Sequence, residues 1–260
     1  MSVYIIYFLI IVLANTVGAI SGMGGGVIIK PVMDAFAFHP LAAITFYSCV
    51  AVFTMSIAST YKQLKNGFKI EWPKAIAISI GSVFGGVLGN KLFTSLLTYF
   101  GDQKQVQLLQ IVLTVLSLIL VLVYTLKSTR TYKLTHLVAY FAIGLFLGGF
   151  STLLGIGGGP INVSLLIFCF SLTMKEATIY SIVTIFFSQL AKLVEIGTTT
   201  GYSIFDLSLL VAIIPAAIIG GYLGGYFSGK VSEEKVSKIF IAVVVLVIVI
   251  NVVNGVMLIV

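Results

Sequence analysis

Long apolar stretches separated by short polar ones make up most of this chain. They approach or exceed the ~20 residues that an α-helix needs to cross a ~30 Å hydrocarbon core. The stretches are continuous and do not alternate every second residue, which favours membrane helices over a β-barrel. The predicted spans are 3–21, 41–60, 73–93, 106–126, 134–154, 177–194, 205–227 and 236–258.

Two further apolar stretches, 25–37 and 158–171, are too short to cross. Each follows a glycine cluster, Gly22-Met-Gly-Gly-Gly26 in the first case and Gly155-Ile-Gly-Gly-Gly159 in the second. We therefore expect two short helices that begin at glycines and are re-entrant or broken. The predicted fold class is an all-α polytopic membrane protein.

Composition excludes several classes of protein. The chain is 59% hydrophobic and only 9% charged, whereas an average soluble domain has about 25% charged residues. A soluble enzyme, a disordered chain and a nucleic-acid binder are therefore excluded, because so few charges cannot cover a water-facing surface. The net charge of +7 comes from basic residues in short loops, where they act as topological signals. We expect a multi-pass protein of the cell inner (plasma) membrane, in contact with the lipid bilayer and not with nucleic acid.

The chain repeats itself about halfway along. Similar features occur in the same order in both halves, which indicates a tandem duplication. We assign 1–130 as the first transmembrane repeat and 131–260 as the second, together forming one integral-membrane domain. The matching pairs are the glycine clusters at 22–26 and 155–159, Tyr47-Ser48 and Tyr180-Ser181, and Gly85-Gly86-Val-Leu-Gly89 and Gly220-Gly221-Tyr-Leu-Gly224.

The distribution of basic residues favours inverted over parallel halves. If every long stretch crosses, the halves are parallel and the basic residues divide almost equally between the two faces, which contradicts the positive-inside rule. If 25–37 enters the membrane and 41–60 returns to the same face, the halves are inverted. We then expect both termini outside and the loops 61–74 and 127–133 in the cytoplasm. One face collects Lys62, Lys65, Lys69, Lys74, Lys127, Arg130, Lys133, Lys230, Lys235 and Lys238, and the other keeps Lys91, Lys104 and Lys192.

The glycine clusters are candidate anion sites. Backbone N–H groups at a helix start lack internal partners, and the helix dipole places partial positive charge there. Glycines let the backbone approach an anion closely, as at half-helix N-termini in transporters with repeated folds. The alternative is close packing of helices through small residues. We favour packing for the mid-span glycines, namely Gly81, Gly85, Gly86, Gly89, Gly220, Gly221, Gly224 and Gly225.

The two motifs resemble those of a known family. Gly22-Met-Gly-Gly-Gly-Val-Ile-Ile-Lys-Pro31 and Gly155-Ile-Gly-Gly-Gly-Pro160, with His39-Pro40-Leu-Ala-Ala43 after the first, are similar to the sulfite exporter TauE/SafE family of membrane permeases. The resemblance covers the whole chain: its length, its duplicated halves and the position of both motifs. It implies a permease for sulfite, sulfonates or related sulfur oxyanions, often moved outward. The second motif is followed by Thr173-Met-Lys-Glu-Ala177, which lacks a proline, so the two hairpins are not expected to be equivalent.

Polar residues near the two motifs are further candidates. Polar groups inside a membrane usually face a cavity or a partner helix, and hydroxyl and amide donors could bind an oxyanion. The alternative for a single Ser or Thr is a hydrogen bond to a carbonyl of its own helix. The predicted substrate-binding residues are Gly22, Gly24, Gly25, Gly26, Gly155, Gly157, Gly158, Gly159, Asn162, Thr45, Ser48, Thr178, Ser181, Gln189 and Lys30.

Charged residues inside the spans have structural interpretations. Lys30 and Asp34 are spaced i, i+4 and are expected to pair, with attraction of anions by Lys30 as the alternative. Lys192 and Glu195 are spaced i, i+3 near a span end, where an interfacial pair is expected.

The remaining reactive residues are also interpreted structurally. Glu71 and Asp206 precede equivalent helices, and for both we favour capping over proton coupling. His39 is favoured as a turn residue over a proton relay. Cys49 and Cys169 are favoured as small buried hydrophobes over groups that touch a sulfur substrate.

No catalytic constellation is present in the sequence: there is no HExxH motif, no Walker lysine and no pair of carboxylates within one span. We therefore expect neither an enzyme nor a cofactor or metal site. The leading hypothesis is a permease or secondary transporter of a small sulfur-containing oxyanion, bound near the midplane with alternating access. A passive anion channel and a non-transporting membrane scaffold are the alternatives. The expected partners are the small anion and the lipid bilayer, and a homodimer stays open.

Overall fold

The computed structural model describes residues 2–36, 38–101, 103–127, 130–154 and 159–259. Within these ranges the chain is helical and contains no strand. Eight helices among the described residues are long and apolar enough to cross a membrane, which confirms the predicted all-α membrane class. They are α1 (Ser2–Ser21), α3 (Leu41–Lys65), α4 (Trp72–Phe100), α5 (Gln103–Lys127), α6 (Leu137–Leu154), α8 (Met174–Thr199), α9 (Leu210–Lys230) and α10 (Glu233–Ile259).

Two short helices follow the glycine clusters, as predicted. These are α2 (Gly26–Phe36) and α7 (Pro160–Phe170), each of 11 residues. At 1.5 Å per residue such a helix reaches about half of a ~30 Å hydrocarbon core. Neither can therefore cross a membrane alone. A 3₁₀ helix, η1 (Leu207–Leu209), leads into α9.

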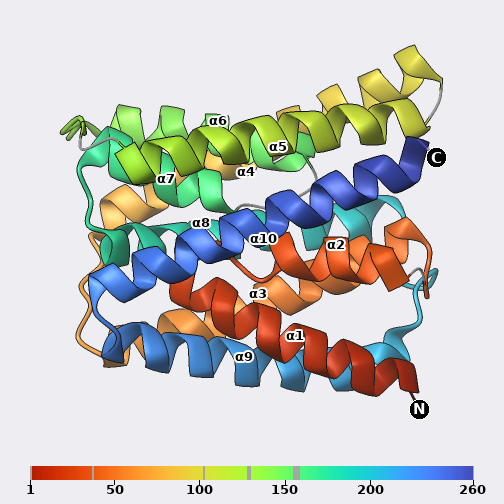
Figure 1. The fold of residues 1–260 in the computed structure, drawn as a ribbon, viewed down its shortest axis with the longest axis horizontal. Helices are drawn as coiled ribbons and strands as arrows, with labels where there is room; N and C mark the ends of the chain where they lie inside the picture. The colour runs from red at the N-terminus through yellow and green to blue at the C-terminus, as the bar shows by residue number, and fades with distance from the viewer. Residues whose placement is uncertain (1, 37, 102, 128–129, 155–158, 260) are drawn as a thin grey trace.

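The helices lie roughly along one direction, and both termini lie at the same end of the bundle, which we term the terminal end (Figure 1). Helix α1 runs away from this end, α2 runs back toward it, and α3 then runs the length of the bundle. The prediction that 41–60 returns to the face from which 25–37 enters is therefore wrong, because α3 has 25 residues and runs from one end of the bundle to the other. The sharp reversal lies between α1 and α2, where Gly22 and Gly24 take positive φ values of 75° and 72°.

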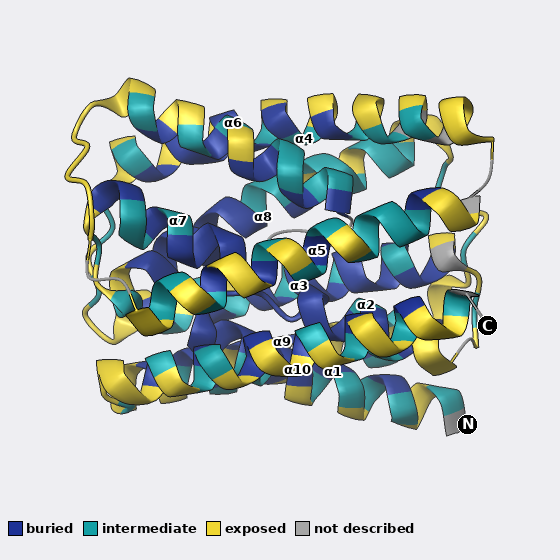
Figure 2. Ribbon diagram, turned by 45° about the horizontal axis from the view of Figure 1, so that its top comes forward, coloured by how far each residue is buried: buried dark blue, intermediate teal, exposed yellow. Residues whose placement is uncertain are grey.

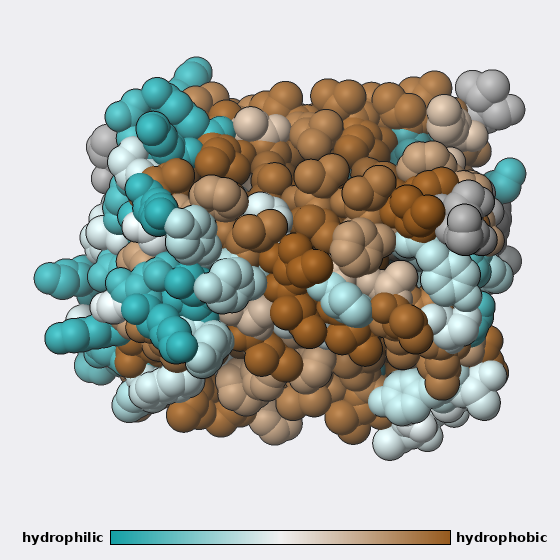
Figure 3. Space-filling view, turned by 90° about the horizontal axis from the view of Figure 1, so that it is seen from below, coloured by the Kyte–Doolittle hydropathy of each residue, from teal (hydrophilic) through white to brown (hydrophobic). Residues whose placement is uncertain are grey.

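Basic residues gather at the opposite end, which we term the basic end. It holds the chain between α3 and α4, α5 and α6, α7 and α8, and α9 and α10. Figure 3 shows hydrophilic residues concentrated at its left end, which is the basic end, and a hydrophobic belt across the middle. Lys175, which the sequence left unassigned, also lies at this end. The basic residues elsewhere are Lys30, Lys91, Lys104 and Lys192.

The two halves interlock. Helix α1 of the first half packs along α9 of the second, and α6 of the second half packs along α4 of the first. Helices α3 and α8 also meet each other across the halves, and they are among the most buried helices at the centre of the bundle (Figure 2). The first helix of each half therefore packs against the fourth helix of the other half.

Glycines form the contact between α4 and α6. A Cβ atom built on Gly85 would lie 2.0 Å from the carbonyl oxygen of Leu145, and one on Gly81 would lie 2.1 Å from that of Phe141. From the other side, a Cβ on Gly148 would lie 1.9 Å from the Ser82 carbonyl oxygen. The helix backbones therefore touch directly, which only glycine permits.

The equivalent contact between α9 and α1 is built in the same way. Cβ atoms on Gly220 and Gly224 would lie 2.8 Å and 2.6 Å from carbonyl oxygens of Val12 and Thr16. The prediction that the mid-span glycines serve close packing is confirmed at both contacts.

Replacing Gly85 with alanine should lower the free energy of unfolding by about 1–3 kcal/mol, because α4 and α6 must separate to admit the methyl group. Thermal unfolding of the purified protein in detergent would measure the change. Gly255→Ala is the matched control, since its added carbon meets only the Ile111 side chain, at 3.2 Å, and alanine favours a helix by about 1 kcal/mol over glycine. Equal stability of the two variants would contradict the glycine contact.

Candidate functional site

The first glycine cluster is tightly packed. The N–H of Gly24 donates to the carbonyl oxygen of Gly18 at 3.2 Å. A Cβ on Gly25 would lie 1.9 Å from Asn15 Oδ1, and one on Gly22 would lie 2.5 Å from Thr178 Cα. These glycines therefore allow a sharp turn with neighbouring backbone and side chains against it, and leave little room for a ligand.

The second cluster reaches the first. Gly159 has a φ of 123° and precedes α7. A Cβ built on it would lie 3.6 Å from Val27 Cγ2 and 3.9 Å from the Met23 carbonyl oxygen. The starts of α2 and α7 therefore lie beside each other. The predicted site residues Gly155, Gly157 and Gly158 lie outside the described residues.

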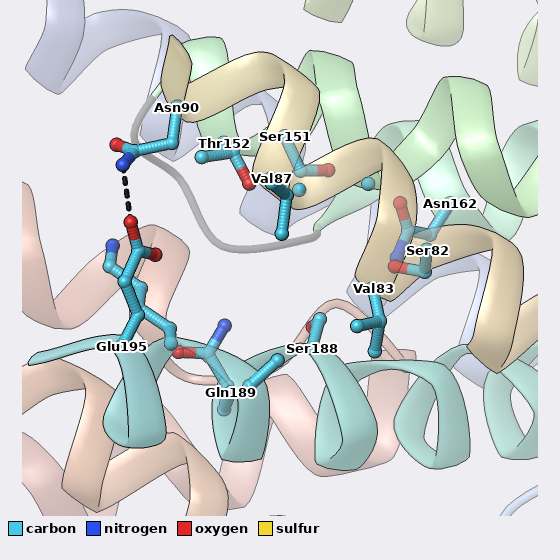
Figure 4. Close-up of a pocket in the computed structure, with 14 residues that line it drawn as sticks. Ser82, Val83, Val87, Asn90, Ser151, Thr152, Asn162, Ser188, Gln189 and Glu195 are labelled. Carbon is cyan, nitrogen blue, oxygen red and sulfur yellow. Dashed lines mark hydrogen bonds between the residues drawn. The ribbon is translucent and has the colours of Figure 1, made fainter. Parts of the chain in front are cut away.

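A cavity of about 200 Å³ opens beside α7, between α4, α6 and α8 (Figure 4). It is smaller than the ~300–1,000 Å³ of pockets for drug-sized ligands. Since water occupies about 30 Å³ per molecule in the liquid, the cavity has room for a small anion with a few waters. Its polar lining residues are Ser82 and Asn90 of α4, Ser151 and Thr152 of α6, Asn162 of α7, and Ser188, Gln189, Lys192 and Glu195 of α8.

Several of these polar groups face the cavity without a partner in the described part of the chain. Asn162 is 3% exposed, and its Oδ1 atom makes no hydrogen bond. The hydroxyls of Ser151 and Thr152 also bond to no described residue, whereas Thr184 on α8 donates to its own helix at Tyr180, at 2.8 Å. Because an unpartnered buried polar group is costly, the buried Asn162 Oδ1 atom points to water or a ligand in the cavity.

Helix α8 contributes the charged residues of the cavity lining, Lys192 and Glu195. Glu195 accepts a hydrogen bond of 2.5 Å from Asn90 Nδ2, which links α8 to α4. The expected ion pair between Glu195 and Lys192 is therefore wrong: among the described residues Lys192 makes no salt bridge. The half-buried Lys192 therefore supplies a positive charge to the cavity lining.

Two adjacent stripes of α4 have different roles. Gly81, Gly85 and Gly89 meet α6, while the next stripe, with Ser82, Gly86 and Asn90, lines the cavity. A Cβ on Gly86 would meet only Thr152 Oγ1, at 3.3 Å.

The equivalent face of α9 is covered by α3. At positions equivalent to Gly86 and Asn90, Gly221 and Gly225 lie against α3, where added Cβ atoms would be 2.6 Å from the Met55 carbonyl oxygen and 3.0 Å from that of Ser59. The space equivalent to the cavity is therefore filled where α9 packs against α3.

Comparing the halves position by position would have revealed these residues from the sequence. The polar residues of the cavity mostly correspond to small or apolar residues at the equivalent positions of the other half, a difference that packing alone does not require. The pairs, cavity residue first, are Ser82 and Ala217, Asn90 and Gly225, Ser151 and Gly18, Thr152 and Ala19, Asn162 and Ile29, Ser188 and Met55, Lys192 and Ser59, and Glu195 and Lys62.

Of the predicted binding residues, the structure places Asn162 and Gln189 in the cavity lining. Thr178 donates to its own helix at the Met174 carbonyl oxygen, at 2.8 Å, and Ser181 donates to the Gly22 carbonyl oxygen, at 2.6 Å.

Three other predicted binding residues lie away from the lining. Thr45 and Ser48 belong to α3 and do not line this cavity. Lys30 borders a separate space of about 40 Å³ between α2, α5 and α10. Its Nζ atom lies 3.2 Å from Asp34 Oδ2, which confirms the predicted pair.

The carboxylates before α4 and α9 differ. Asp206 accepts hydrogen bonds from the hydroxyl and the N–H of Ser208, at 2.6 Å and 3.0 Å, which confirms capping. These bonds hold the pKa of the Asp206 carboxyl below its usual value. Glu71 instead pairs with Lys74 at 2.7 Å, so its carboxylate does not cap the helix.

The turns before α3 and α8 differ, as predicted. His39 Nδ1 lies 2.8 Å from the Tyr7 hydroxyl, next to Pro40 and the start of α3. Before α8 the chain instead uses a capping box, in which Thr173 and Glu176 exchange hydrogen bonds. Both turns hold the helix that follows, by different chemistry.

Both cysteines are buried, as predicted. Cys49 donates through its thiol to the Gln189 carbonyl oxygen at 3.6 Å, behind the cavity wall. No group of three or more metal-ligating side chains occurs within the described ranges.

The chain is similar to one known protein family over most of its length. A family model described as sulfite exporter TauE/SafE matches residues 7–251, which confirms the resemblance carried by the twin motifs. No curated protein and no solved structure matches the chain significantly. The family is one of transporters, in line with the expectation that the chain is not an enzyme. With a family match over residues 7–251 and eight helices able to cross a membrane among the described residues, this multi-pass membrane protein belongs to the sulfite exporter TauE/SafE family.

Proposed function

We propose that the chain is a secondary transporter for a small sulfur-containing oxyanion, such as sulfite or a sulfonate, in the cell inner (plasma) membrane. The proposed binding site is the cavity between α4, α6, α7 and α8. One observation carries the proposal: unpartnered polar groups and a cation line this cavity, while the equivalent space in the other half is closed.

The chemistry of the cavity suits an oxyanion. Lys192 supplies a positive charge, and Ser82, Ser151 and Thr152 supply hydroxyl donors from two helices. Asn162 lies just inside the start of α7, where the helix dipole favours negative charge. Hydrogen bonds to a charged group contribute about 1.5–3 kcal/mol each, so a few such donors can replace part of the anion's hydration shell.

The opposite charge in the cavity is restrained. Glu195 would repel an anion if its carboxylate faced the centre of the cavity. The hydrogen bond from Asn90 holds it at one end, away from Ser82 and Asn162 (Figure 4). We place the anion at the end with Ser82 and Asn162.

We further propose that the halves are inverted repeats, with the basic end in the cytoplasm. Three observations support this arrangement: both termini lie at one end, each half's first helix packs on the other half's fourth, and basic residues gather at the opposite end. The positive-inside rule then sets the orientation. Rocking of one half against the other would expose the cavity to each side in turn.

Replacing Thr152 with valine removes one hydroxyl from the cavity and keeps the side-chain shape. Loss of a hydrogen bond to an anion should lower kcat/KM for sulfite by about ten- to hundredfold. Lys192→Gln should lower it at least as much, because it removes the cation. Transport would be measured as sulfite flux in proteoliposomes.

Thr184→Val is the matched control for Thr152→Val, because the Thr184 hydroxyl bonds to its own helix and does not line the cavity. It should transport at the normal rate. Equal rates for all variants would place the anion elsewhere. Flux that neither saturates nor shows counterflow would instead assign a passive channel.

Single cysteines placed by Lys69→Cys, Lys133→Cys and Tyr202→Cys test the orientation. A membrane-impermeant maleimide applied to intact cells should label the variant at 202, at the terminal end, and leave the variants at 69 and 133 unlabelled. Permeabilised cells should label all three, and the buried Cys49 and Cys169 give little background. Labelling at 69 or 133 in intact cells would overturn the proposed orientation.

A further inference from the structure

An apolar groove of about 650 Å³ runs along the outside of the bundle between α3 and α9. Thr54, Ile57 and Tyr61 line it from α3, and Ile218 and Tyr222 line it from α9. The isoleucines and tyrosines among these are exposed. The two helices run in the same direction and both end at the basic end, so the groove leads toward that face.

Three lysines stand where the groove reaches the basic end, each above a tyrosine ring. Lys62 Nζ lies 5.2 Å from the centre of the Tyr222 ring, and Lys65 Nζ lies 4.6 Å from that of Tyr61. Lys230 Nζ lies 4.3 Å from the centre of the Tyr226 ring. Among the described residues none of these lysines pairs with a carboxylate. The apolar groove therefore ends in a concentrated positive charge.

The length of this feature matches one leaflet of a bilayer. Thr54 and Lys65 are separated by 11 steps along α3, which is about 17 Å at 1.5 Å per residue. Half of a ~30 Å hydrocarbon core is about 15 Å. An acyl chain in the groove would therefore reach the bundle middle with its headgroup beside the lysines.

The equivalent surface of the other half is built differently. Phe187 of α8 occupies the position equivalent to Thr54 of α3. The pocket that Phe187 lines between α8 and α4 has a volume of only about 140 Å³. Val194 replaces Tyr61, and Glu195 replaces Lys62. The duplicated fold alone therefore requires neither the groove nor its lysines.

We infer that the groove between α3 and α9 is a binding site for one anionic phospholipid of the leaflet at the basic end. The acyl chain lies between Thr54 and Tyr222, and the phosphate meets Lys62, Lys65 and Lys230. Basic residues between membrane helices bind anionic headgroups in this way, and tyrosines suit the interface. A second copy of the chain is disfavoured as the occupant, because a two-fold contact at this groove would bring the same lysines together.

The test uses delipidated protein titrated with phosphatidylglycerol or phosphatidylcholine of identical acyl chains, with bound lipid counted by native mass spectrometry. We expect one phosphatidylglycerol to bind about tenfold more tightly than phosphatidylcholine, since each nearby lysine strengthens anionic binding. The Lys62→Gln and Lys65→Gln double variant should lose that preference. The double variant Lys127→Gln and Lys235→Gln, which removes basic-end charges from other helices, is its control and should keep it.

Thr54→Phe tests the acyl-chain part of the groove, because it introduces the residue that the other half uses. It should weaken binding of both lipids, while Thr54→Val should leave binding unchanged. Equal affinity for the two lipids in the wild-type protein, or a preference that survives Lys62→Gln and Lys65→Gln, would overturn the inference. So would a wild-type dimer that Thr54→Phe separates, since the groove would then be a subunit interface.

Discussion

Direct contact between helix backbones is the constraint on which the rest of this structure depends. In a bilayer, apolar side chains gain little by leaving lipid for another helix, so association relies on close packing. Here the glycines of α4 and α9 bring whole helices against α6 and α1. Because one stripe of α4 is committed to α6, the stripe beside it must face α8, and the cavity opens there. The glycine contact therefore positions the proposed site as well as holding the fold.

The helix pairs α4–α8 and α9–α3 occupy matching places in the two halves, and side-chain size and polarity distinguish the spaces beside them. Gly86 and Asn90 of α4 leave room between α4 and α8. Gly221 and Gly225 of α9 instead let α9 close onto α3, and the pocket beside these two helices lies on the lipid-facing side, where Thr54 is smaller than Phe187. Lys62 and Glu195 occupy equivalent positions of the two halves and differ in the same way. Lys62 lies over Tyr222 at the membrane-facing groove, and Glu195 lines the cavity inside the bundle. A single fold thus presents an internal polar site and an external apolar one.

The sequence predicted the features that depend on local pattern. Hydropathy located the long helices, and the glycine clusters located α2 and α7. The cavity was largely missed, because it depends on which helix faces meet: Ser82 and Asn90 lie far along the chain from both glycine motifs and reach the site only through the packing of α4 on α6. Thr178 and Ser181 are close to a motif and yet serve packing. The hairpin was misplaced because hydropathy does not report backbone dihedral angles, and the reversal occurs at Gly22 and Gly24.

The interlocking of the halves has a consequence for biogenesis. Helix α1 leaves the ribosome long before its partner α9 has been synthesised. Helix α4 likewise waits for α6, with its glycine face uncovered in the meantime. Contacts between such distant segments form late and leave intermediates exposed. The helices of residues 1–130 therefore cannot complete their packing until the helices of residues 131–260 have been synthesised.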